Sequence, residues 1–184
     1  MSFIKTDIPD LLVFEPKVFE DARGYFYESF NAKHFEAEGI NANFVQDNQS
    51  FSSKGVLRGL HYQLDPMAQS KLVRVISGEV LDVAVDIRKG SPTFGKWFSI
   101  RLSAKNKKQL YVPRGFAHGY AVLSETAEFF YKCDNFYSKE NERGIMFNDA
   151  ILNIDWEMDL KDAIISEKDM LNKSFTDAEM NFTF

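Results

Sequence analysis

The chain of 184 residues contains one cysteine, Cys133, and only three histidines. A single thiol excludes an internal disulfide and a cysteine-cluster metal site, which favours a reducing compartment such as the cytoplasm. No apolar run approaches the roughly 18 residues that a membrane-spanning helix needs. The residues that follow Met1 lack the basic and apolar regions of a secretory signal, so we expect a cytoplasmic protein.

Clustered positive charge is also lacking. The net charge is -5, the pI is near 5.3, and the Lys and Arg residues are scattered. This distribution argues against a nucleic-acid-binding surface or a polybasic membrane patch, so any anionic ligand must be small and bound locally. No repeat, low-complexity tract or long linker divides the chain, and its length suits a single domain over residues 1–184.

Aromatic residues are plentiful, with 18 Phe and 7 Tyr against 10 Gly, a composition that favours β-strands. Apolar and polar residues alternate through residues 70–88 on both sides of Ser77-Gly78, which predicts a hairpin. Similar short runs lie at residues 11–20, 25–30, 43–51, 56–64, 96–102, 108–112, 117–123 and 127–137. Such closely spaced strands predict an all-β barrel or sandwich.

Two short helices are expected beside these strands. Asn31 is a suitable N-cap and Gly39 a suitable C-terminal stop for the first helix, and Ser166 opens the second. The last residues, 181–184, are expected to become ordered only through packing on a partner.

The run 55–64 places an arginine and a histidine three residues apart, at Arg58 and His61. Strand alternation puts His61 on the face opposite to Leu60 and Tyr62, so it faces a cavity or solvent. A base with a cation beside it suits proton abstraction from an anionic substrate. The alternative is a histidine that only satisfies a hydrogen bond in the interior.

Three further side chains are candidates for the same chemistry. Lys71 begins a strand on the same face as Val73, where it either emerges into water or lies inside and stabilises an enolate. Tyr131 and Tyr137 share one face of the run 127–137, and each is either a proton donor or a core aromatic.

Asp169 stands three residues after Ser166, and this capping-box spacing favours a cap over a carboxylate that orients His61. His118 follows a Pro-Arg-Gly turn and could bind a metal together with His61. However, neither has a second histidine within two to five residues, and His34 lies on the predicted helix. We therefore expect no metal site and a hydrogen-bonding role for His118.

Six separated blocks share their order and spacing with one enzyme family. They are Phe19-x-Asp21-x-Arg23-Gly24-x-Phe26-x-Glu28, Phe44-Val45-Gln46-Asp47-Asn48, Gly55-Val56-Leu57-Arg58-Gly59-Leu60-His61-Tyr62-Gln63, Lys71-Leu72-Val73-Arg74-Val75, Pro113-x-Gly115-Phe116-x-His118-Gly119 and Ser166-x-Lys168-Asp169. Through these blocks the chain resembles the dTDP-4-dehydrorhamnose 3,5-epimerase family from about residue 10 to about residue 170. Any one block alone would be a weak signal.

The resemblance implies a cupin-type jelly roll with a few short helices, assembled as a homodimer and holding neither a metal nor another cofactor. The implied reaction converts dTDP-4-dehydro-6-deoxy-D-glucose to dTDP-4-dehydro-L-rhamnose by epimerisation at C3 and C5. Such a reaction needs a base on one face of the sugar, an acid on the other and a cation to stabilise the enolate between them.

The resemblance also implies roles for individual residues. His61 is implied as the base, Asp169 as its carboxylate partner and Lys71 as the cation near the 4-keto oxygen. Tyr131 is implied as the acid and Tyr137 as a positioning residue. Substrate contacts are implied for Arg23, Glu28, Gln46, Asp47, Asn48, Arg58, Lys71, His118, Tyr137, Glu142 and Lys168, with Arg23 and Glu28 serving the neighbouring subunit's pocket.

Residues 65–70 depart from the family, which more often has Pro-Pro and Gln shortly before the lysine, so we expect a changed loop. Three other functions stay open. A mono-epimerase acting at C3 or C5 alone would retain the same base and acid. A non-catalytic sugar-nucleotide-binding cupin would bind without proton exchange, and a metal-dependent cupin oxygenase or isomerase would need more metal ligands.

Overall fold

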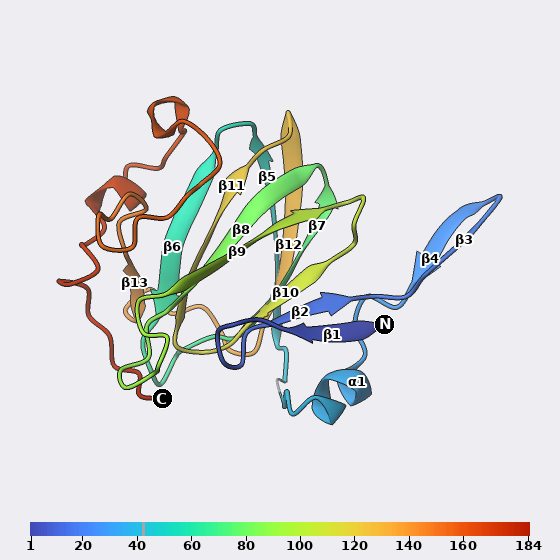
Figure 1. Ribbon diagram of the computed structural model, residues 1–184, viewed down its shortest axis with the longest axis horizontal. Helices are drawn as coiled ribbons and strands as arrows, with labels where there is room; N and C mark the ends of the chain where they lie inside the picture. Colours follow the sequence, from blue (N-terminus) through green and yellow to red (C-terminus); the bar gives the residue numbers. More distant parts are fainter. Residues whose placement is uncertain (42) are drawn as a thin grey trace.

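The computed structural model describes residues 1–41 and 43–184, and antiparallel β-sheet dominates them (Figure 1). One sheet has the strand order β1 (Ser2–Lys5), β2 (Leu12–Glu15), β10 (Gln109–Val112), β7 (Lys71–Ser77), β12 (Thr126–Cys133), β5 (Gln46–Ser53). The other has the order β13 (Glu142–Gly144), β6 (Leu57–Gln63), β11 (Phe116–Val122), β8 (Glu79–Asp86), β9 (Trp97–Ser103). The all-β prediction is confirmed.

Strand side chains alternate between two buried layers. The inner layer lies between the two sheets and contains Val73 of β7, Ala84 of β8 and Phe129 of β12. The outer layer lies between the five-stranded sheet and the C-terminal segment, which contributes side chains from Ile145 to Phe182. Because β8 and β11 are buried on both faces, an inward polar side chain on either strand must find a partner.

The predicted hairpin over residues 70–88 is wrong, although both of its strands exist. β7 pairs with β10 and β12, whereas β8 pairs with β11 and β9 in the other sheet. Gly78 forms a corner between the sheets, with φ +77° and Thr126 so close that a Cβ would lie 2.0 Å from its carbonyl oxygen. Alternation fixes which face a residue occupies, but it does not identify the neighbouring strand.

The first helix follows its sequence signals. α1 (Ala32–Ala37) begins after Asn31, whose side chain accepts from the Lys33 N–H at 3.1 Å, and it is followed by Gly39 at φ +82°. Helical structure after Ser166 is shorter than the sequence suggests, because η2 (Asp169–Leu171) is a single 3₁₀ turn. A similar turn, η1 (Leu160–Asp162), lies earlier in the C-terminal segment.

The expectation that residues 181–184 need a partner for their order is also wrong. Phe182 is buried, and its carbonyl oxygen accepts from the Lys89 N–H at 2.9 Å. The Phe184 N–H donates to the Lys89 oxygen at 3.0 Å, and the Arg88 guanidinium lies 4.8 Å from the Phe184 ring centroid. The tail therefore packs on its own chain.

A two-stranded ribbon, β3 (Val18–Asp21) and β4 (Gly24–Tyr27), pairs with neither sheet and projects from the body of the molecule (Figure 1). The predicted strand over residues 11–20 is thus divided between β2 and β3, with Pro16 in the break. No helix in the described part of the chain is long and apolar enough to cross a membrane.

Candidate active site

His61 points into the space between the sheets. Its neighbour Leu60 belongs to the outer apolar layer, so strand alternation turns His61 inward, where it stands opposite His118 of β11. Gly59 permits a close approach of the two strands, because its φ is +126° and a Cβ there would lie 2.6 Å from the Gly119 Cα. The sequence predicts that His61 faces a cavity or solvent, and in the structure it lines a cavity.

The carboxylate of Asp169 forms a hydrogen bond with the His61 ring. Its Oδ1 lies 2.5 Å from His61 Nε2, and the carboxylate side chain is only 4% exposed. Burial alone would raise the pKa of Asp169, but its hydrogen bond with His61 holds that pKa below its ordinary value. Since a carboxylate only accepts, the ring hydrogen belongs on Nε2 and the lone pair of Nδ1 is left as the basic site.

Of the two roles considered for Asp169, its side chain has the contact with His61 and not the cap. Its backbone N–H donates to Ser166 Oγ at 3.1 Å, which is the serine half of the expected capping box, but its carboxylate binds His61 and lies 3.5 Å from the Gly59 nitrogen. Local sequence detects the cap because both partners lie within one turn. The contact with His61 spans 108 residues and depends on the tertiary fold.

Lys71 and Tyr131 stand on the facing sheet. Lys71 points inward and is half-buried, with its Nζ 5.9 Å from the Tyr131 ring centroid. Burial lowers the pKa of Lys71 and raises the pKa of Tyr131 to about 12. The phenol therefore keeps its proton at neutral pH and is a potential donor. The sequence leaves open whether Lys71 emerges into water or lies inside, and in the structure it lies inside.

Three hollows share His61 in their walls. The inner cavity, of about 170 Å³, is lined by Ser50, Arg58, His61, Lys71, His118, Gly119, Tyr120, Phe129 and Tyr131. A second hollow of about 120 Å³ adds Tyr137 and Glu142 to His61, Lys71 and Tyr131. A third, of about 420 Å³, combines the apolar Val56, Leu57, Ile164 and Ile165 with Arg58, Ser166, Lys168 and Asp169. A base and a potential acid thus line the same cavity.

A polar cluster borders the second hollow. The Tyr137 hydroxyl donates to Glu142 Oε2 at 2.7 Å, and Lys168 Nζ lies 2.5 Å from the same oxygen. Despite burial, which would raise it, these contacts hold the pKa of Glu142 below its ordinary value. Tyr137 shares a hollow with Tyr131 as expected, but it lies beyond the end of β12, so strand alternation is not the cause.

Strand β5 contributes polar side chains to opposite faces. Gln46 donates to Asn48 Oδ1 at 3.1 Å, and its own Oε1 accepts from the Tyr137 N–H at 3.1 Å. Asn48 is the cross-strand partner of Tyr131. Asp47, in contrast, forms an ion pair with Lys132 at 3.0 Å on the other face, so the structure does not bring it to the inner cavity.

Arg58 and His118 both line the inner cavity. Arg58 donates from Nε and Nη2 to Ser52 Oγ, each at 3.2 Å. His118 is buried, and its Nε2 lies 2.9 Å and 3.0 Å from the two carboxylate oxygens of Asp82. The expected hydrogen-bonding role of His118 is therefore observed, with a partner that the sequence analysis missed.

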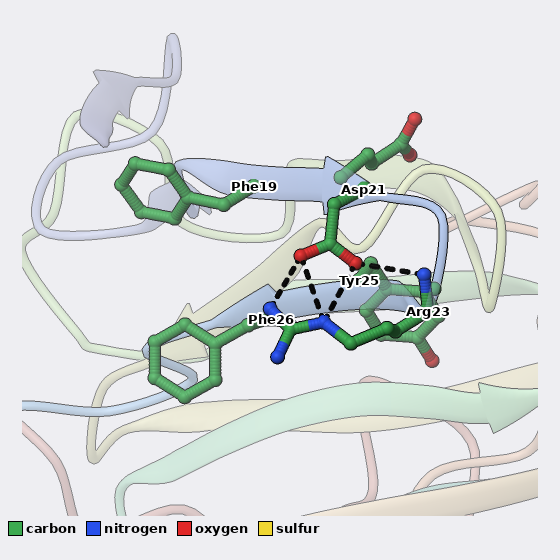
Figure 2. Close-up of a pocket in the computed structure, with 7 residues that line it drawn as sticks. Phe19, Asp21, Arg23, Tyr25 and Phe26 are labelled. Carbon is green, nitrogen blue, oxygen red and sulfur yellow. Dashed lines mark hydrogen bonds and ion pairs between the residues drawn. The ribbon is translucent and has the colours of Figure 1, made fainter.

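Arg23 and Glu28 are not brought to His61 within this chain. Arg23 lies at the tip of the β3–β4 ribbon, where its side chain is 89% exposed and folds back onto Asp21 at 2.5 Å (Figure 2). The hollow of about 550 Å³ on this ribbon is bordered by the exposed rings of Phe19, Tyr25 and Phe26. Glu28 follows the ribbon, and its Oε1 lies 3.5 Å from Nε2 of His34 in α1.

Asp82 was not among the sequence candidates. The only local signal is an acidic residue at an inward position between the apolar Leu81 and Val83 of β8. Within residues 1–41 and 43–184, no group of three or more His, Cys, Asp or Glu side chains is arranged to hold a metal ion. The His61 and His118 rings each face a carboxylate instead.

Comparison with known proteins gives concordant matches. The family model described as dTDP-4-dehydrorhamnose 3,5-epimerase matches residues 5–177. A dTDP-4-dehydrorhamnose 3,5-epimerase from Shigella flexneri is 61% identical over 97% of this chain and 98% of its own. A crystal structure of the enzyme so named from Elizabethkingia anophelis has a TM-score of 0.93 at 57% identity, covering 96% of this chain and 97% of that one.

A second solved structure contains a ligand. It is a dTDP-6-deoxy-D-glucose-3,5-epimerase from Legionella pneumophila in complex with dTDP-4-keto-L-rhamnose. Its TM-score is 0.91 at 52% identity, with 95% of this chain and 93% of that chain covered.

Proposed function

The chain belongs to the dTDP-4-dehydrorhamnose 3,5-epimerase family, and from this premise we propose that it converts dTDP-4-dehydro-6-deoxy-D-glucose to dTDP-4-dehydro-L-rhamnose. The protein is an isomerase that inverts C3 and C5. The observation that carries this function is the opposition of His61, backed by Asp169, to Tyr131 and Lys71 across one cavity. A carbon held between the two walls meets a base on one face and an acid on the other.

Each inversion moves two protons. His61 Nδ1 removes the hydrogen from a carbon next to the 4-keto group, and the electron pair moves onto the keto oxygen to form an enolate. The Lys71 ammonium stabilises the charge on that oxygen. The Tyr131 hydroxyl then protonates the carbon from the opposite face, which restores the ketone with inverted configuration.

Both reacting groups must be reset before the next inversion. After one turn His61 carries an additional proton and Tyr131 has lost one, so His61 must release a proton and Tyr131 must gain one. The hollows around His61 provide space for water to exchange these protons. The hydrogen that appears at each inverted carbon therefore comes from solvent.

The remaining polar groups suit a nucleotide-linked sugar. Arg58 and Lys168 are cations near His61 that fit a diphosphate, and Gln46, Asn48 and Glu142 offer hydrogen bonds to a sugar or a thymine. His118 binds the sugar from the wall of the inner cavity, and Tyr137 positions the substrate. Asp47 contacts the substrate only if it exchanges its present partner, Lys132.

The chain folds as one cupin-type jelly-roll domain, 1–184, and works as a homodimer in the cytoplasm without a cofactor. The projecting ribbon supports the dimer, because Arg23 and the rings of Phe19, Tyr25 and Phe26 remain exposed on it. In the dimer, Arg23 and Glu28 serve the neighbouring subunit's pocket. The buried free thiol of Cys133 supports a reducing compartment.

The test is to incubate the protein in deuterated water with dTDP-4-keto-6-deoxyglucose and a reductase that traps the product, while NMR follows C3 and C5. Deuterium at both carbons of a trapped L-sugar is expected. Label at only one carbon would replace the proposal with a mono-epimerase. Absence of label, with substrate binding retained, would point to a binding module.

A further inference from the structure

Four carboxylates are buried in the described part of the chain: Asp82, Asp86, Asp149 and Asp169. Three of them accept hydrogen bonds from several donors, among which backbone N–H groups recur. Asp82 is fully buried on β8, yet its carboxylate has one partner among the described residues, the His118 ring. A buried carboxylate held by one donor is costly to keep, which suggests that its charge serves the cavity.

The contact fixes how the His118 ring is presented. A carboxylate only accepts, so the Nε2 atom between the two Asp82 oxygens carries hydrogen. Nδ1 makes no hydrogen bond to any described residue, and the ring lines the inner cavity with His61, Lys71 and Tyr131. Asp82 therefore determines which nitrogen of His118 remains available to a ligand.

The same carboxylate lies close enough to influence Lys71, because the His118 ring that it holds lines the inner cavity together with Lys71. The titratable or charged groups around this ammonium are Arg58, His61 and Tyr62 from β6, Asp82 from β8, His118 and Tyr120 from β11, Tyr131 and Cys133 from β12, Tyr137 after β12, and Glu142 from β13. Burial lowers the pKa of Lys71, and Cys133, Asp82 and Glu142 act in the opposite direction.

Among these opposing groups, Asp82 is the one whose charge is not already neutralised by a surface cation. Burial raises the pKa of Cys133, so its thiol is neutral near pH 7. Glu142 is paired with Lys168 at 2.5 Å. The Asp82 carboxylate thus remains to offset the burial of Lys71.

We propose that Asp82 is a positioning residue for the epimerisation: it fixes the His118 tautomer that faces the sugar and stabilises the Lys71 ammonium that faces the enolate. Asp82 itself does not line the inner cavity. It acts through His118 and Lys71, and the inference rests on the proposed function only for the identity of the substrate.

The first test is Asp82→Asn, which keeps the size of the side chain and removes its charge. We expect kcat to fall by about 10- to 100-fold, as when a group that orients a reacting centre is lost, with KM nearly unchanged. Because Lys71 loses the attraction that raises its pKa, the basic limb of the kcat profile moves to lower pH. An unshifted limb would overturn the charge role, whatever the loss in kcat.

The matched control is Asp86→Asn, four residues along the same strand and equally buried. Asp86 lines none of the hollows around His61, so this variant should lose stability without moving the pH limb of kcat. An equal shift in both variants would mean that any lost carboxylate on β8 disturbs the site, and would overturn the specific role of Asp82.

Histidine ¹⁵N NMR of the wild-type protein tests the tautomer without relying on a foldable variant. The chain has three histidines, and a His118→Gln variant identifies the signal. Hydrogen on Nε2 of His118 is expected, and an Nε2 without hydrogen would overturn the inference. If the wild-type protein introduces no deuterium into dTDP-4-keto-6-deoxyglucose, the proposed function is contradicted instead. Failure of the inference about Asp82 and failure of the proposed function are therefore distinguishable.

Discussion

The two buried carboxylates of strand β8 lie four residues apart and are held in contrasting ways. Asp86 accepts from the guanidinium and backbone N–H of Arg88 and from the hydroxyls of Ser91 and Thr93. Asp82 accepts from His118 alone among the described residues. A carboxylate surrounded by donors stabilises the fold, whereas one with a single donor leaves its charge to act on neighbours in the cavity.

The Asp86 end of β8 connects segments that are distant in sequence. Arg88 pairs with Asp10 at 2.7 Å and donates to the Pro9 carbonyl at 3.0 Å. Its guanidinium also lies 4.7 Å from the Phe116 ring centroid and 4.8 Å from that of Phe184. This end therefore attaches an N-terminal loop and the C-terminal tail to the strands that carry Asp82 and His118.

The largest effect is expected at the inner cavity, next to the Asp82 end of β8. His61→Ala removes the proposed base there and leaves the Asp86 end unchanged. We expect kcat to fall by about 10³-fold or more, because no other group is placed to remove the proton. The variant should still fold, with a lower thermal stability because the buried Asp169 loses its partner. Turnover and thermal unfolding are measured on the same preparation. Lys105→Ala, at an exposed position that lines none of the hollows around His61, is the control and should keep wild-type activity. A folded His61→Ala variant with wild-type turnover would remove His61 from the mechanism.

Arg88→Met disrupts the Asp86 end of β8, because it leaves the Asp86 carboxylate buried without its cation. We expect the free energy of unfolding to fall by about 3 to 5 kcal/mol, the usual cost of an uncompensated buried charge. Urea unfolding gives this value, and activity per folded molecule should be preserved at low temperature. Arg101→Met removes an exposed pair with Glu157 and should cost less than about 1 kcal/mol. Equal losses in the two variants would contradict the structural role assigned to Arg88.

Local sequence predicts the parts of this site that follow from strand alternation. The inward direction of His61 and Lys71 can be read from their apolar neighbours, because a one-residue change of face would bury polar groups in the outer layer. The same information does not reveal which strands pair, so the 70–88 hairpin was predicted within one sheet although Gly78 turns the chain into the other.

Contacts between distant segments lie beyond local patterns. The His61–Asp169 contact joins residues 108 apart and the His118–Asp82 contact joins residues 36 apart. Family resemblance supplied the first pair, since Asp169 lies in a recognisable block, whereas Asp82 lies outside the blocks that carried the resemblance. Asp82 became visible only when the structure placed it behind His118.

The smallest predicted effect in this comparison is the loss, at acid pH, of the stability that the Asp86 carboxylate contributes. Burial alone would raise the pKa of Asp86, but hydrogen bonds from Arg88 and two hydroxyls hold it below its ordinary value. A carboxyl group with a lowered folded pKa contributes stability that is present above its unfolded pKa of about 3.9 and is lost as the pH falls below it through the folded value.

The difference in unfolding free energy between the wild type and Asp86→Asn should therefore be constant near neutral pH and shrink below about pH 4. Urea unfolding at a series of pH values measures it. Glu125→Gln, which alters an exposed pair with Lys54, should show a small difference with little dependence on pH. A difference for Asp86→Asn that stays constant at acid pH would mean that the Asp86 end stabilises the fold through packing rather than through its ionised carboxylate.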